Sequence, residues 1–137
     1  MKFYKTLFFI FIFLTCSVKA DLNNNLINEL KQGGKLIFIR HAYAPGNGDP
    51  QNFNLYDCST QRNLNENGRE QSKKIGNLFL KNKIDIKNVY SSEWCRCKET
   101  ASIAFKNFKT KKFLNSFYSS QFAKNRKKQV KEFQEFI

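Results

Sequence analysis

The 137-residue sequence contains a single histidine, His41, and this scarcity limits the chemistry open to it. A metal cage built from several histidines is excluded, as is any reaction that takes two histidines from these residues. Glycine and proline are also scarce, at six and two residues, which excludes collagen-like and low-complexity chains. With 41% hydrophobic residues and this length, the composition is that of one globular domain.

Long hydrophobic runs are lacking as well. The longest, residues 7–14, has eight apolar residues, whereas a membrane-spanning helix needs about 20. Two lysines precede this run, and residues 18–20 (Val-Lys-Ala) follow it, a pattern typical of a secretory signal peptide. We therefore expect residues 1–20 to be a cleaved signal peptide and residues 21–137 to be periplasmic or secreted. A lipid anchor on Cys16 is a lesser alternative.

Acidic residues are outnumbered, with 11 Asp and Glu against 24 Lys and Arg and a formal charge of +13. Cleavage removes three lysines and no acid, which lowers the charge to +10 and still favours anionic partners. The lysines are scattered, with no zinc-finger spacing and no ladder of arginines and aromatics, so we expect no nucleic-acid binding. Binding to an anionic membrane surface stays an open alternative, although the expected link to a membrane is the export signal alone.

Three cysteines remain after cleavage: Cys58, Cys95 and Cys97. An oxidising compartment permits one disulfide among them and leaves one thiol. Cys95 and Cys97 are too close in sequence to bridge each other comfortably, so we expect Cys58 to pair with one of the two. Reduced cysteines in the core are the alternative reading.

Helical and extended patterns alternate along the mature chain. The spacing predicts helices over 22–32, 66–82 and 97–108 and from about residue 120, strands over 35–39 and within 84–90, an extended stretch over 113–118 and a long loop over 43–63. Residues 35–39 are continuously apolar, which predicts a strand buried on both faces. With the helix that follows the loop, the two strands predict a parallel βαβ unit. The last helix is expected to bury Val130, Phe133 and Ile137.

Two arginines and the histidine follow the ends of the predicted strands. Because the carboxyl ends of parallel strands meet at one sheet edge, Arg40, His41 and Arg96 should face one crevice. An imidazole can attack phosphorus, and guanidinium groups clamp phosphoryl oxygens. Asn47 could add a donor from the loop. The plain alternatives are a structural histidine and an arginine stacked at the surface beside Trp94. We expect no metal, because two cysteines around Arg96 make a poor zinc set.

Three segments together resemble the histidine phosphatase superfamily, which has the phosphoglycerate-mutase-like fold. They are FIRHAYAPGN at 38–47, LNENGREQSKKIG at 64–76 and VYSSEWCRCKETA at 89–101. The resemblance implies an α/β three-layer sandwich with a mainly parallel sheet. It also implies a phosphatase that hydrolyses phosphate monoesters through a phosphohistidine at His41, without a cofactor. Arg40 and Arg96 then match the phosphate-clamping arginines, and Asn47 matches the loop residue that reaches the phosphate. Structural positions of the family are matched by Leu64, Gly68, Thr100 and Ala101.

The sequence departs from the family pattern in three ways. Ala42 replaces the usual glycine, Asn65 replaces the usual threonine, and the second histidine of the family has no counterpart. We therefore expect residues 21–137 to be an incomplete domain, truncated at the C-terminus before the strand with the second histidine. A catalytically impaired phosphate-binding remnant is the alternative function.

The expected partner is a small phosphorylated substrate. The residues around Asp57 and Arg96 look most like exported members of the family, some of which act on cell-envelope phosphates. Such a phosphate is one candidate substrate, and the sequence does not choose among the phosphate esters. Mutase activity is not expected, because no loop for a second substrate phosphate is recognisable.

Overall fold

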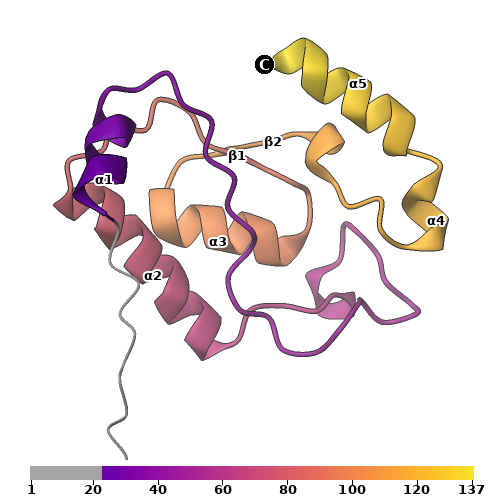
Figure 1. Ribbon diagram of the computed structural model, residues 1–137. Helices are drawn as coiled ribbons and strands as arrows, with labels where there is room; N and C mark the ends of the chain where they lie inside the picture. Colours follow the sequence, from indigo (N-terminus) through magenta and orange to yellow (C-terminus); the bar gives the residue numbers. More distant parts are fainter. Residues whose placement is uncertain (1–22) are drawn as a thin grey trace, which may run out of the picture.

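The computed structural model describes residues 23–137, so the predicted signal peptide lies outside the described residues. Helices dominate, and two strands form one small sheet (Figure 1). The order of elements is α1 (Asn24–Lys31), η1 (Cys58–Thr60, a 3-10 helix), α2 (Glu66–Lys81), β1 (Tyr90–Ser91), α3 (Cys95–Phe105), β2 (Lys109–Thr110), η2 (Lys112–Leu114, also 3-10), α4 (Ser120–Ala123) and α5 (Arg126–Phe136). Between residues 23 and 137, every helix is too short or too polar to cross a bilayer.

Helix α2 forms as the sequence predicts. Asn65 caps its first turn, with the side-chain oxygen accepting from the amide of Gly68 at 3.0 Å. The helix ends where Lys83 takes a left-handed conformation, with φ at 54°. An asparagine side chain therefore caps this helix, at the position where the resemblance noted above expects threonine.

Helices α2 and α3 lie side by side (Figure 1), and a glycine permits their close approach. A Cβ on Gly76 would lie 2.3 Å from the carbonyl oxygen of Ala104, so only glycine fits at this crossing. Phe79 and Phe105 meet edge to face, with ring centroids 5.3 Å apart. This helix pair is the framework on which the candidate site is built.

The sheet is parallel, and β1 lies at the end of the strand predicted within 84–90, whereas its partner β2 is not a predicted strand. Tyr90 pairs with Lys109 and Ser91 with Thr110, so α3 is the crossover helix of the observed βαβ unit. The predicted buried strand over 35–39 is wrong for the described chain. Those residues run extended without ladder partners, and the side chain of Phe38 is 72% exposed. In the described residues no neighbouring strand offers its backbone to this segment, so the apolar run alone does not bury it.

The C-terminal region also differs from its prediction. Two helices, α4 and α5, replace the single one expected, and η2 covers the start of the stretch over 113–118 that was expected to be extended. Val130 and Ile137 are exposed, whereas Gln129 is buried because its Nε2 donates to the carbonyls of Lys112 and Asn115. The contact between α5 and η2 is therefore made by the Gln129 amide as well as by aromatic rings. The described residues form an α/β fold, and the three-layer sandwich stays a prediction.

Candidate active site

His41 lies at the end of the extended segment, and the residues after it are fixed by both long helices. The amide of Ala42 donates to the Thr100 hydroxyl of α3 at 3.0 Å, and the amide of Tyr43 donates to Oε1 of Gln71 on α2 at 2.8 Å. A Cβ on Gly68 would come within 2.0 Å of the Tyr43 carbonyl oxygen. Gly68 therefore lets the backbone beside His41 settle against the start of α2.

The imidazole of His41 is held in one neutral tautomer. Its Nδ1 lies 2.7 Å from the carbonyl oxygen of Ala42, and because a carbonyl can only accept, Nδ1 holds the proton. The lone pair is then on Nε2. Burial lowers the pKa of His41, and the charges of Arg96, Arg62 and Arg40 lower it further, while the Ala42 carbonyl opposes them. The histidine is therefore uncharged at neutral pH.

Arg96 is the buried cation of the site, with only 7% of its surface exposed. It lies in the first turn of α3, and its guanidinium meets the carboxylate of Asp49 end-on, at 2.7 Å from Nη1 and 3.1 Å from Nη2. Nη1 also donates to the carbonyl of Arg62 at 3.2 Å. Both hydrogens of Nη1 are thus used, together with one hydrogen of Nη2.

The Nε of Arg96 is buried and has no hydrogen-bond partner among the described residues. Together with the second hydrogen of Nη2, its N–H forms the side edge of the guanidinium, the edge that grips carboxylate or phosphate oxygens as a fork. A buried unpaired donor costs about 1–3 kcal/mol. Such a donor, on an arginine whose charge acts on His41, is the feature expected of an anion site, because an anion would satisfy it.

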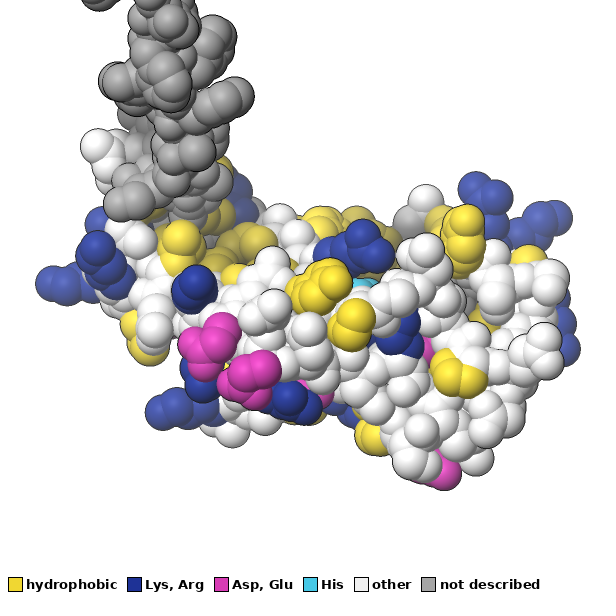
Figure 2. Space-filling model, turned by 90° about the horizontal axis from the view of Figure 1, so that it is seen from below, with side chains coloured by type: hydrophobic (Ala, Val, Ile, Leu, Met, Phe, Trp, Pro, Cys, Tyr) yellow, Lys and Arg dark blue, Asp and Glu magenta, His cyan; other side chains and the backbone are white. Residues whose placement is uncertain are grey.

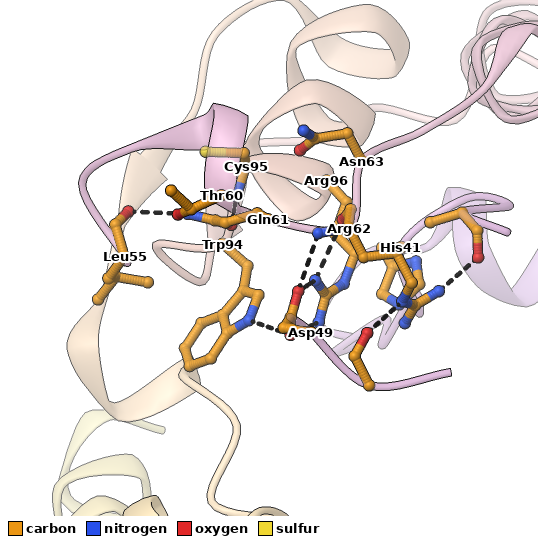
Figure 3. A network of polar contacts seen from close by, with 12 residues as sticks. His41, Asp49, Leu55, Thr60, Gln61, Arg62, Asn63, Trp94, Cys95 and Arg96 are labelled. Carbon is orange, nitrogen blue, oxygen red and sulfur yellow. Dashed lines mark hydrogen bonds and ion pairs between the residues drawn. The ribbon is translucent and has the colours of Figure 1, made fainter. Parts of the chain in front are cut away.

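Asp49 was not singled out by the sequence. Its carboxylate accepts from Arg96, from the Trp94 indole at 3.1 Å and from the backbone amide of Arg62 at 3.1 Å (Figure 3). Burial works to raise the pKa of Asp49, but these donors outweigh it and hold the pKa below its ordinary value. The carboxylate is therefore an anion that lies against Arg96.

Arg62 is a third guanidinium of the site that sequence reasoning missed. Its Nε donates to the carbonyl of Gly48 at 2.8 Å, and its Nη1 donates to the carbonyl of Ala44. It thereby holds together the two ends of the turn at residues 44–48. The signal that could have found both residues is charge, since Asp49, Asp57 and Arg62 are the only charged residues in the loop 43–63.

The loop is also tied to the start of α3 by a disulfide. Cys58 pairs with Cys95, and the buried Gln61 accepts from the Cys95 amide at 3.0 Å. The same Gln61 donates to the carbonyls of Asn54 and Leu55, so one side chain joins two stretches of chain. Cys97 keeps a free thiol, and burial raises its pKa.

The remaining predicted site residues lie at the surface. Arg40 is exposed, and its charge contributes to the lowered pKa of His41. Asn47 is exposed between two glycines with positive φ, and no hydrogen bond joins its side chain to other described residues. The imidazole, the only cyan side chain in Figure 2, shows as a small patch among basic side chains. The charges of Arg40, Arg62 and Arg96 thus all act on His41, whereas no hydrogen bond joins Asn47 to these residues in the described chain.

These segments match a known family of enzymes. The family model of the histidine phosphatase superfamily (branch 1) matches residues 36–116, more than half of the chain. The chain belongs to the histidine phosphatase superfamily. A phosphatase or mutase type of activity follows in general terms, as does an α/β fold. Searches among curated proteins and among solved structures give no match.

Proposed function

We propose that this histidine phosphatase hydrolyses phosphate monoesters through a phosphohistidine formed on Nε2 of His41. The observation that carries the proposal is the open, buried edge of Arg96 near a neutral imidazole. A phosphoryl group at this edge would satisfy the buried Nε donor and lie where the charges of three arginines act on the histidine.

The reaction takes two steps. In the first, the Nε2 lone pair attacks phosphorus, an N–P bond forms, the ester P–O bond breaks, and the leaving alkoxide takes a proton from solvent water and departs as the alcohol. In the second, water attacks phosphorus, the N–P bond breaks, and inorganic phosphate leaves with the imidazole restored. Nδ1–H, held by the Ala42 carbonyl, stabilises the ring as charge develops on it. Arg96 and Arg40 stabilise the charge on the phosphoryl oxygens.

Asn47 is proposed as a donor to the same phosphate from the rim of the site. The substrate is proposed to be a small phosphorylated molecule, with a cell-envelope phosphate as one candidate. The Cys58–Cys95 disulfide supports a periplasmic or secreted location, because such bonds persist in oxidising compartments.

The test compares the wild type with His41→Ala and Arg96→Ala, using p-nitrophenyl phosphate as the probe. We expect His41→Ala to abolish hydrolysis and Arg96→Ala to lower kcat/KM by about 100-fold or more. Phosphate and vanadate should inhibit the wild type. Lys87→Ala, at an exposed lysine that forms no hydrogen bond or ion pair with these residues, is the control and should keep full activity. Hydrolysis that survives His41→Ala unchanged would contradict the proposal.

A second candidate is phosphate binding without turnover, favoured by the single histidine of this sequence. The same arginines would then hold a phosphorylated ligand while the chemistry stays incomplete. Thermal unfolding in the presence of phosphate separates the two. A rise in Tm without hydrolysis supports binding alone, and a rise in Tm with hydrolysis supports the phosphatase.

A further inference from the structure

We propose that Asp49 is the positioning residue of the phosphate site: its carboxylate holds the Arg96 guanidinium by one edge so that the other edge faces the phosphoryl group. The inference rests on the proposed function, because it explains how the buried arginine is kept ready for a phosphate. It assigns a role to an acid that does not itself meet the substrate.

Asp49 is itself held in place. Besides Arg96, two neutral donors reach its carboxylate, the Trp94 indole and the Arg62 amide, both at 3.1 Å. The indole is packed in turn, with the Phe53 ring stacked on it at 5.3 Å. A carboxylate fixed by donors from two separate segments cannot swing away with a single rotamer change.

The planar geometry of the Arg96 guanidinium fixes the direction of its free edge. An arginine has five N–H donors in a rigid plane, and fixing two of its nitrogens fixes the direction of the rest. Asp49 takes the Nη1 and Nη2 ends, so the unpartnered Nε–H and the last Nη2 hydrogen are held in one direction. Arg96 would otherwise have to lose side-chain entropy each time a phosphate bound, and preorganisation removes that cost.

Asp49 is unsuited to two other roles that an acid could have at this site, those of a general acid and of a competitor for the phosphate. A general acid must hold a proton near the working pH, yet the donors around Asp49 keep its pKa below the ordinary value. A carboxylate that plugs the phosphate site would compete for the open edge of Arg96, yet Asp49 lies at the opposite ends, and Nε has no partner among the described residues. Of these three roles, only positioning agrees with a carboxylate that binds the Nη1 and Nη2 ends of Arg96.

The experiment measures the inhibition constant of inorganic phosphate on the full chain, well below Tm, for the wild type and Asp49→Asn. We expect the variant to bind phosphate between about 10- and 100-fold more weakly and to lose kcat/KM by a similar factor. Asp57→Asn is the matched control, since it makes the same change in the same loop at a fully exposed acid. It should leave the phosphate constant unchanged.

Phosphate binding that is equal or tighter in Asp49→Asn would overturn the inference, and tighter binding would show that Asp49 competes for Arg96. If the wild type itself neither binds nor hydrolyses phosphate esters, the proposed function fails and the inference fails with it. If the wild type is active and Asp49→Asn equals it, the inference alone fails.

A measurement on the unaltered protein covers the case in which Asp49→Asn does not fold. Trp94 is the one tryptophan in the sequence, so its indole N–H gives one assignable NMR signal. Positioning predicts that this signal keeps its hydrogen-bonded shift when phosphate saturates the site, because the Asp49–Trp94 bond stays. A signal that moves to the shift of a free indole would mean that phosphate displaces Asp49, which would overturn the inference.

Discussion

The loop 43–63 and the extended segment 35–40 approach the same histidine, but they are held in opposite ways. The loop has no long regular element, yet a disulfide, a buried ion pair and two buried or half-buried side chains, those of Gln61 and Arg62, tie it down. The segment has the stronger apolar pattern, yet Leu36 is 62% exposed and the residues pair with no strand in the described chain. Cross-links fix an irregular loop better than a hydrophobic pattern fixes a strand without neighbours.

The part of the site in the loop is therefore held more firmly than the part that contains His41. Arg96, Asp49 and Arg62 belong to the cross-linked half. His41 is held mainly through the next two residues of the chain, Ala42 and Tyr43. Changes in the cross-links should therefore cost most, and changes in the extended segment least.

The largest effect is expected from reducing the Cys58–Cys95 disulfide. The bond closes a loop with a sequence separation of 37, and loop-closure entropy for that length corresponds to about 4 kcal/mol. Urea unfolding with and without reductant should show a loss of about 2–4 kcal/mol. Cys97→Ser keeps the disulfide and should show the same dependence on reductant. Equal midpoints in the two conditions would mean that the loop does not depend on this bond.

A smaller loss is expected from Gly68→Ala, which tests the junction of the two regions. The new Cβ would lie 2.0 Å from the Tyr43 carbonyl oxygen, so the backbone after His41 or the start of α2 must move. We expect a loss of about 1–3 kcal/mol in the free energy of unfolding, measured by urea. Asn67→Ala, at the exposed neighbouring position, should be close to neutral. If the two variants behave alike, the close approach does not constrain the site.

The protonation of His41 tests both parts of the site at once, because burial and arginines from both parts lower the pKa of its imidazole. Burial and the three arginines place its folded-state pKa below 6.5. The unfolded chain then takes up the proton first, so this histidine lowers stability as the pH falls below 6.5 and has no such effect above. As the sole histidine, it gives one NMR titration curve, whose midpoint should lie below 6.5. In Arg96→Ala the midpoint should rise, and a fall would contradict the arrangement.

The smallest effect is expected from Leu36→Ser in the extended segment. The side chain is 62% exposed, so its replacement removes little buried area. The free energy of unfolding should change by no more than about 0.5 kcal/mol. The same change at Leu64, which is buried, should cost several times more and serves as the contrast. A large loss at Leu36 would show that the segment is buried in solution.

Prediction from the sequence worked where the signal is local. The spacing of apolar residues located α2 to within one residue at its C-terminal end. The shared catalytic role of His41 and Arg96 stays a prediction. Prediction was wrong for residues 35–39, because burial of a strand depends on partners that an apolar run does not specify. It missed Asp49 and Arg62, because their role depends on contacts across 47 and 18 residues of chain.

The sequence by itself determined the family and the helices that frame the candidate site. These depend on short-range spacing, which the chain encodes within a few residues. Only the tertiary structure decided that Cys58 pairs with Cys95, that Asp49 faces Arg96 and that the apolar segment before His41 stays exposed. Each of these depends on which groups meet in space, and the energy of a contact or of burial exists only once the chain has brought both partners together.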